Sequence, residues 1–372
     1  MAYRFEASTL TGTLLGAIER FSTTTPRTVS FGLSRPTTCA FALRLDDELI
    51  DVLQRDPCRI RVYDMARSPS LVGHLDLIDD EEVAGEGGLG TVQFNCSDQW
   101  WLLTRRVFGG SREGYSQGTA LVPVERGVIA ASVLDLVNAL SETGVRSNPS
   151  VVPAGATFVA DWRFKSAGEA ISELASTLDG FEWVIDPIEY TAGKVGDFKT
   201  YGALGTYQEH ASFEYGHGRH NVKSFRSPRT RQTQANVAYS LPAGWPDNTT
   251  EDPAIAEDAA SQAKWLRVED VVPGDVTAQL RQQLVEEHVR VRKEPRKLWS
   301  FEPILQAGDS DNRVPVFGVD YDVGDLVPLR IKVRVGSELA TRFDGVVRVF
   351  QVNVTIDAEG NVTSQTVVAG SE

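Results

Sequence analysis

Cysteine is scarce in this sequence of 372 residues: only Cys39, Cys58 and Cys96 are present, and none of them stands in a CxxC spacing. Small disulfide-stabilised domains need dense, even sets of cysteines, and three is an odd number. The three residues lie far apart in the sequence and match no zinc-binding pattern. We therefore predict three reduced, buried thiols in a protein made in the cytosol.

Long apolar runs are also absent. No stretch approaches the roughly 18–20 apolar residues that a membrane-spanning helix needs. The first ten residues, MAYRFEASTL, lack the basic stretch followed by an apolar stretch that marks a secretory signal. We therefore predict no membrane insertion and no secretory signal.

Positive charge is in deficit, because 37 Lys and Arg stand against 51 Asp and Glu, a formal net charge of −14. Such a balance argues against a surface built mainly to grip nucleic acid or anionic lipid. It remains compatible with DNA that passes nearby without adhering. Hydrophobic residues make up 41% of the chain, which is typical of a folded protein with real cores rather than a disordered one.

Two catalytic signatures are missing, since no HExxH and no Walker A motif occurs. GEGGLG at 85–90 formally matches GxGxxG, but it follows an acidic run and enters a strand, whereas dinucleotide binding needs a helix after the loop. The acidic run 79–82 is typical of a solvated loop, although paired carboxylates also serve glycosidases. We predict no catalytic, cofactor-binding or metal-binding residue and no cofactor.

Three of the five histidines, His210, His217 and His220, cluster beside Glu209 and Glu214. Imidazoles and carboxylates can bind a transition metal. This spacing matches no standard site, and a Gly-rich loop loses much entropy on ordering, so we interpret it as an exposed loop. The alternative is a metal held where three such loops meet on a symmetry axis.

Two basic stretches, 225–231 and 290–297, stand out in so acidic a chain. We interpret them as inter-subunit salt-bridge partners or solvated edges, with phosphate contact as the alternative. The adjacent Trp100 and Trp101 are interpreted as core anchors, with a subunit contact as the alternative.

The first third of the chain reads as β-structure. Ile60 and Val62 alternate with Arg59, Arg61 and Tyr63, which predicts a strand with one buried face. Further strands are expected at 31–33, 41–45, 70–79 and 91–103, with a hairpin loop at 79–90. Several short strands of this kind indicate a barrel or a sandwich.

The middle of the chain mixes helices and strands. Apolar residues at helical spacing predict a helix over 129–140 that ends before Gly144. Ser166 and Glu169 form a capping box, which predicts a second helix over 166–179, followed by a strand at 181–186.

From residue 206 onward strands return. Two are expected around a basic turn in 220–241, and one or two helices between 254 and 292, where Leu280, Leu284, Val285 and His288 form a stripe. Further strands are expected at 297–305, 326–335 and 345–357. The strict alternation of Val347, Val349, Gln351 and Asn353 before the turn 357–361 predicts a hairpin.

The order of these segments resembles the hub proteins of phage tail tips, also known as baseplate hubs or minor tail proteins. RIRVYDMARSPSLVGHLDLIDDEE (59–82) is similar to a strand–turn–hairpin of that family, and TVQFNCSDQWWLLTRR (91–106) to its strand and short helix ending in paired arginines. Residues 167–187 resemble the helix and strand of its middle region. Residues 318–335 and 343–357 resemble its closing strands, with Gly324-Asp325 before the first of them. The segment 242–274 has no counterpart.

The resemblance implies a mainly β fold with α+β insertions. Two tail-tube-like β-barrel domains are expected at 1–108 and 206–372, the second with a helical insertion at about 253–293. They flank a middle α+β region at 109–205. Two barrels from each of three copies would form a pseudo-hexameric ring.

The same resemblance implies a structural virion protein, a homotrimeric hub at the distal end of the tail that adapts a six-fold tube to a three-fold tip. The expected partners are other copies of itself, the distal tail protein, the tape-measure protein and tail fibre or receptor-binding proteins. Genomic DNA would pass through the lumen without specific binding, and assembly would occur in the host cytoplasm. Two alternatives stay open: a tail-associated cell-wall hydrolase, although no lysozyme or peptidase extension is expected after residue 372, and a carbohydrate-binding tail protein that uses Trp245 and Trp265.

Overall fold

Strands dominate the computed structural model, with 49% of residues in strands and 18% in helices, which confirms the mainly β class. The structure describes residues 3–19, 21, 25–83, 90–108, 119–120, 125–147, 161–162, 164–176, 180–216, 220–242, 244–246, 251–272, 278–305 and 314–370. Most of the glycine-rich loop at 85–90, His217, and the end of the helix predicted over 166–179 lie outside these residues.

One sheet of 14 strands forms the frame of the molecule. Its strands are β1 (Tyr3–Thr9), β2 (Leu14–Ala17), β3 (Arg27–Gly32), β4 (Thr38–Arg44), β5 (Cys58–Asp64), β6 (Leu71–Val83), β7 (Thr91–Ser97), β15 (Phe213–Tyr215), β16 (Val222–Arg226), β17 (Arg229–Thr230), β21 (Arg296–Pro303), β22 (Leu326–Val335), β23 (Glu338–Ile356) and β24 (Val362–Gly370). Eleven of them follow the order β16-β21-β24-β23-β3-β4-β7-β6-β5-β1-β2, while β15, β17 and β22 pair beside this path. No closed barrel is found among the described residues, so the two barrel domains stay a prediction.

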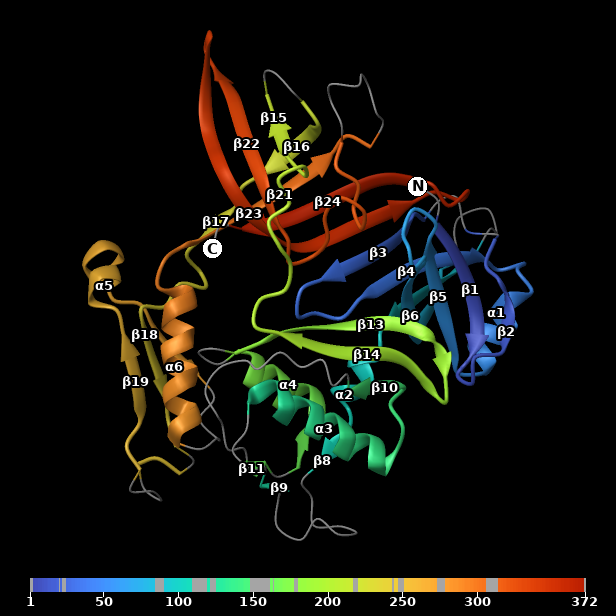
Figure 1. Cartoon of the computed structure of the whole chain (residues 1–372), viewed down its shortest axis with the longest axis horizontal. Helices are drawn as coiled ribbons and strands as arrows, with labels where there is room; N and C mark the ends of the chain where they lie inside the picture. Colours follow the sequence, from blue (N-terminus) through green and yellow to red (C-terminus); the bar gives the residue numbers. More distant parts are fainter. Residues whose placement is uncertain are drawn as a thin grey trace.

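The two strand-rich ends of the chain meet where β23 pairs with β3 (Figure 1). In this antiparallel ladder Val352 lies opposite Phe31, and Val354 lies opposite Val29. A single cluster of buried apolar side chains runs through both ends of the chain, from Phe5 to Ala369. The frame is therefore continuous across the region where we expected two separate domains, whose boundaries remain predictions.

The C-terminal hairpin of β23 and β24 is confirmed, but the strict alternation expected along its first strand is interrupted after residue 349. Val347 and Val349 are buried, and the next buried residues are Val352 and Val354 rather than Gln351 and Asn353. A bulge between Val349 and Gln351 inserts one residue and exchanges the two faces.

The strand β6 is longer than the sequence predicted. Residues 79–83, expected in the loop, continue β6 and pair with β7, so that Asp80 lies opposite Phe94 and Glu82 opposite Val92. Arg59 lies on the face of its strand opposite Ile60 and Val62, as expected. Its side chain is buried against Asp76, with Nε 2.6 Å from the carboxylate, because the middle region covers that face.

The middle region contains α3 (Arg126–Leu140) and α4 (Ala167–Ala175), which lie below β13 (Glu182–Thr191) and β14 (Lys194–Tyr201) in Figure 1. The predicted capping box is present, since the Ser166 hydroxyl accepts the Glu169 N–H while the Glu169 carboxylate accepts the Ser166 N–H. Ile171 and Leu174 are buried against the inner face of α3. The remaining elements are α1 (Leu49–Arg55), α2 (Trp100–Leu103), β8 (Val107–Phe108), β9 (Thr119–Ala120), β10 (Val145–Ser147), β11 (Asp161–Trp162) and β12 (Lys165–Ser166).

A separate unit, here called the inserted unit, is formed between β17 and β21. It consists of β18 (Val237–Ser240), β19 (Ala254–Glu257), α5 (Ala259–Trp265), β20 (Glu269–Val272) and α6 (Ala278–Arg292). Its strands form a sheet of order β19-β18-β20, and α6 packs against β18 and β19. The two strands predicted in 220–241 therefore exist as β16 and β18 but belong to different sheets.

Candidate functional site

The three cysteines are free and buried, as predicted. Cys39 on β4 lies opposite Cys96 on β7. Burial raises the pKa of the Cys39 thiol to about 12 and that of Cys58 to about 11. The nucleophilic form of cysteine is the thiolate, so these groups are unreactive at neutral pH.

The histidine cluster shows no metal geometry in the part that the structure describes. His210 is exposed, and His220 accepts the Gly216 N–H at 3.3 Å through Nδ1. No group of three His, Cys, Asp or Glu residues that could hold a metal ion occurs among the described residues. Because His217 lies outside them, the absence of a metal site stays a prediction.

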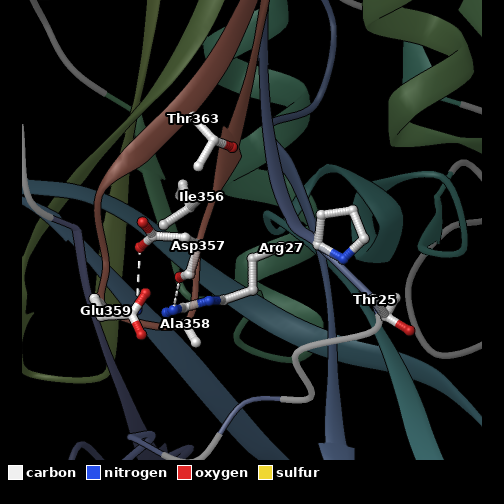
Figure 2. A pocket seen from close by; sticks show the side chains of 8 residues that line it. Thr25, Arg27, Ile356, Asp357, Ala358, Glu359 and Thr363 are labelled. Carbon is white, nitrogen blue, oxygen red and sulfur yellow. Dashed lines mark hydrogen bonds between the residues drawn. The ribbon is translucent and has the colours of Figure 1, made fainter.

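A half-open pocket of about 310 Å³ lies beside the turn between β23 and β24 (Figure 2). Arg27, at the start of β3, is buried there, with its guanidinium 3.4 Å from the centre of the Phe21 ring and donating to the Asp357 carbonyl. Burial lowers the pKa of Arg27 to about 10, so it remains a cation at neutral pH. The carboxylates of Asp357 and Glu359 also line the pocket and oppose anion binding. We therefore infer that Arg27 holds β3 against the hairpin turn through its hydrogen bond to the Asp357 carbonyl.

A buried carboxyl group and a buried imidazole line a small cavity between the frame and the middle region. Asp98 accepts the N–H of Thr37 at 2.7 Å and that of Trp100 at 3.0 Å. Burial nevertheless raises the pKa of Asp98 to about 7. Burial, with a smaller contribution from Arg61 and Arg59, lowers the pKa of His74 to about 4.

The paired tryptophans lie at the start of α2, where the frame meets the middle region. Trp100 is buried and stacks on Trp183, with ring centres 3.8 Å apart. Trp101 is half-buried and donates from Nε1 to Asp76 at 3.0 Å. The interpretation as core anchors is confirmed for Trp100.

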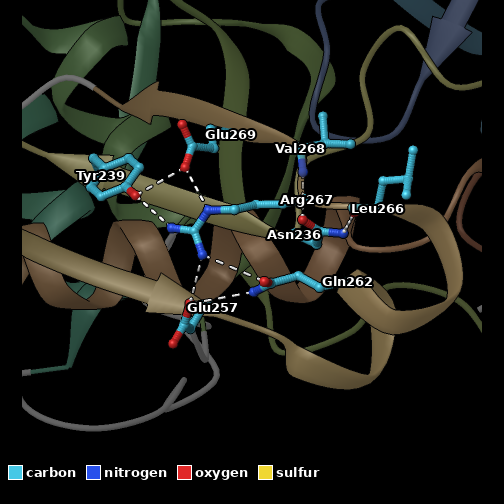
Figure 3. A network of polar contacts seen from close by, with 8 residues as sticks. All are labelled: Asn236, Tyr239, Glu257, Gln262, Leu266, Arg267, Val268 and Glu269. Atoms are coloured by element: carbon cyan, nitrogen blue, oxygen red, sulfur yellow. Dashed lines mark hydrogen bonds and ion pairs between the residues drawn. The ribbon is translucent and has the colours of Figure 1, made fainter.

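A polar network covers one face of the inserted unit's sheet (Figure 3). Arg267 is its centre: it donates to Glu269 at 2.6 Å, to the Tyr239 hydroxyl at 2.7 Å and to Glu257 at 3.3 Å. The hydrogen bond from Arg267 lowers the pKa of Glu269, with a smaller contribution from the hydroxyl of Tyr239. The network joins all three strands of this small sheet.

Beside the network lies a surface that we call the basic patch: Arg229, Arg231, Lys264, Trp265 and Leu266. The three cations lie 4.7–5.3 Å from the centre of the Trp265 ring. Lys264 and the Trp265 Nε1–H both contact the Glu294 carboxylate. Arg229 and Arg231 have no ion-pair partner within the described residues.

Leu266 is presented to solvent by a strained backbone. Its side chain is 80% exposed, and its φ of +70° lies in a region that favours glycine. The buried Asn236 holds this conformation, because its side chain donates to the Leu266 carbonyl at 2.6 Å and accepts the Val268 N–H at 2.8 Å (Figure 3). No sequence signal pointed to this residue, since leucine is not a residue expected at positive φ.

The second basic stretch differs from the first. Arg290 pairs with Glu287, Arg292 with Asp270, and Lys293 with Asp258. These three cations of 290–297 are therefore used within the chain. Arg229 and Arg231 of the first stretch are exposed and lack such partners in the part of the chain that the structure describes, which makes the basic patch the better candidate for a contact with another molecule.

A second charged surface, which we call the acidic edge, consists of residues 78–83 of β6. All six side chains are exposed. Asp79 accepts a hydrogen bond from Asn95, and Asp80 one from Gln54 on α1. No ion pair to the four carboxylates of 79–82 occurs among the residues that the structure describes.

Comparisons with known proteins identify the fold. No family model and no curated protein matches the sequence. Solved structures match it over almost its whole length. A prophage MuSo2 43 kDa tail protein from Shewanella oneidensis has a TM-score of 0.60 at 11% identity, covering 99% of this chain and 96% of that one.

Two further structures agree with this match. A tail protein from Neisseria meningitidis MC58 has a TM-score of 0.59 at 8% identity, covering 100% and 97% of the two chains. The prophage tail protein gp18 from Listeria monocytogenes EGD-e has a TM-score of 0.52 at 9% identity, covering 100% and 95%. The chain thus has the fold of phage tail proteins, which confirms the resemblance at the level of the fold. Within the described residues, no helix has both the length and the apolar character needed to cross a bilayer.

Proposed function

We propose that this chain is a structural phage tail protein, and more finely a homotrimeric hub at the distal end of the tail. The observation that carries the proposal is the shared fold with tail proteins along nearly the full length of both chains. A match of this extent includes the middle region and both strand-rich ends, not one common motif.

The curl of the sheet supports the two tube-like barrels that such a hub needs. At the N-terminal end, the path from β4 through β7, β6, β5, β1 and β2 is followed by a bridge from Phe21 back to Leu43 on β4. At the C-terminal end, β15 pairs with β22, and the Asn221 N–H beside β16 donates to Glu214 of β15. Each end of the frame therefore curls back toward its own first strands.

The role proposed here is assembly geometry rather than chemistry. The net charge of −14 suits a lumen through which DNA passes without adhering. The proposed partners are the distal tail protein, the tape-measure protein and fibre or receptor-binding proteins, and the proposed location is the virion tail tip after assembly in the host cytoplasm.

Electron microscopy of tails labelled with an antibody against this chain tests the proposal. We expect label at the distal tip and three copies per tail in a reconstruction, with the first barrel of one copy beside the second barrel of the next. Six-fold or two-fold symmetry for this chain, or label elsewhere in the particle, would contradict it. Release of soluble fragments from peptidoglycan by the purified protein would favour the hydrolase instead.

A further inference from the structure

We propose that the basic patch of one copy docks on the acidic edge of the next copy, so that copies associate head to tail. This inference rests on the proposed homotrimer and names the surfaces that hold it together. It develops the interpretation of the stretch 225–231 as an inter-subunit salt-bridge partner.

The basic side has one apolar anchor and two cations that have no ion-pair partner among the described residues. Arg229 and Arg231 are exposed and lie against the Trp265 ring, which holds their guanidinium groups in place without neutralising them. Leu266, the residue after Trp265, is exposed on a backbone that Asn236 fixes. Aromatic, arginine and preorganised apolar side chains are the residues that dominate the binding energy of protein interfaces.

The acidic side offers the complementary groups. Its four consecutive carboxylates are flanked by two exposed aliphatic residues, Ile78 and Val83, which are 44% and 40% exposed. The pairing of β6 with β5 ends at Asp76, so beyond this point β6 has no strand partner on that side among the described residues. In the proposed contact, Arg229 and Arg231 of one copy therefore lie against the carboxylates of the next copy, and Leu266 lies against the exposed aliphatic side chains.

The placement of the two surfaces allows a heterologous contact between copies. Trp265 is the last residue of α5, and Asp80 is hydrogen-bonded to Gln54 on α1. Figure 1 shows α5 and α1 at opposite ends of the long axis. Two different surfaces at opposite ends of a subunit generate a heterologous contact, which forms a closed ring when the rotation between copies permits it.

A mixing experiment with charge-reversal variants tests the contact. R229E/R231E removes the basic side, and E81K/E82K removes the acidic side. Each variant alone is expected to lose the trimer in sedimentation velocity, with association weakened at least about tenfold. Mixed together, the two variants carry complementary charges only between unlike chains, intact surface to intact surface and reversed surface to reversed surface. A ring of three cannot alternate two kinds of chain, so we expect mixed species with even copy numbers, such as a 1:1 heterodimer, and no trimer. The four changes combined restore opposite charges and are expected to restore the trimer.

Leu266→Gly separates docking from folding. Glycine accepts the positive φ without strain, so the melting temperature is expected to stay the same or rise, while association falls because the anchor is lost. R334E/R342E reverses two exposed arginines on the β22–β23 hairpin and serves as the matched control. It is expected to leave the trimer intact.

The outcomes distinguish this contact from the hub proposal. If the single-side variants still form trimers, the contact is wrong while the trimeric hub stands. A wild-type chain that stays monomeric in solution also overturns the contact, whereas copy number on the tail decides the hub. Binding of a DNA duplex by the wild-type chain that is lost in R229E/R231E would reassign the basic patch to nucleic acid.

Discussion

The frame and the inserted unit differ in the interactions that hold their elements together. Among the described residues, the main cluster of the frame contains 37 buried apolar side chains, whereas the inserted unit's own cluster contains four: Ala238, Ala254, Val285 and Val289. In the inserted unit, polar contacts around Arg267, Asn236 and Lys293 join the elements instead. Apolar burial supplies most of the stability of a folded domain. Because the inserted unit buries much less apolar surface, we expect it to unfold locally while the frame stays folded.

The largest effect should come from breaking the core of the frame. Phe94 is fully buried and stacks on Phe41, with ring centres 5.3 Å apart. Phe94→Ala is expected to cost about 3–5 kcal/mol of unfolding free energy in a denaturant titration, because it removes a large side chain and leaves a cavity. Phe164→Ala, at an exposed position, should change it by less than about 0.5 kcal/mol. Equal effects of the two changes would mean that the core is misassigned.

A change in the middle region comes next. Leu174 on α4 is fully buried, and Leu174→Ala should cost about 2–5 kcal/mol. Ser166→Ala removes the cap of the same helix and should cost about 0.5–2 kcal/mol. Leu140→Ala, at the exposed end of α3, is the matched control. A melting temperature unchanged by both changes in α4 would refute the assignment of this helix.

Breaking the inserted unit should give a local effect. Asn236→Ala leaves the Leu266 carbonyl and the Val268 N–H without their partner, at a cost of about 1–3 kcal/mol. Hydrogen exchange should then speed up in β18, β20 and α5 while the strands of the frame keep their protection. Asn95→Ala, which removes one exposed hydrogen bond to Asp79, should leave both regions unchanged. Loss of protection throughout the frame would show that the unit is not an independent element.

The smallest expected effect is the pH dependence of stability, because the contributions of two buried titratable groups change in opposite directions with pH. The pKa of Asp98 is about 7 when folded against 3.8 as its ordinary value, so its contribution is fully present below about pH 4 and is lost as pH rises to about 7. The pKa of His74 is about 4 against 6.5, so its contribution is lost as pH falls from 6.5 to 4. The two slopes largely cancel in the wild-type chain.

Variants should separate the two slopes. The melting temperature of Asp98→Asn relative to wild type should rise from pH 4 to 7, and that of His74→Gln should fall from pH 4 to 6.5. The double variant, measured across the same range, is the control and should follow the wild-type profile. Parallel profiles for both single variants would show that neither group titrates as assigned.

Local patterns in the sequence predicted local structure well. The capping box at Ser166 and Glu169, the helix α3 and the final hairpin are all present, because caps, helical periodicity and turns act over a few residues. The bulge after Val349 could not be predicted, since an extra residue in a strand leaves no distinct pattern. The inserted unit's sheet was missed for another reason: β19 and β20 have four residues each and depend on tertiary contacts, namely their pairing with β18 and the packing of α6 against the sheet.

For the candidate site, the sequence indicated which stretches are basic but not which of their cations are paired within the chain. The stretches 225–231 and 290–297 look equally basic, and only the fold shows that Arg290, Arg292 and Lys293 are neutralised within the chain. The role of Leu266 depends on its backbone conformation and on Asn236, 30 residues away in the sequence. Such contacts follow from tertiary structure, which composition and spacing do not encode directly.

The ladder between β3 and β23 has a consequence for how the chain folds as it is synthesised. Val29 pairs with Val354, about 320 residues later, and a ribosome adding ~5–20 residues per second takes roughly 15–65 s to cover that distance. During this time the edge of β3 lacks its native partner, and an unpaired strand edge is a template for aggregation. Chaperones that cover exposed strands on nascent chains are therefore expected to raise the yield of this protein.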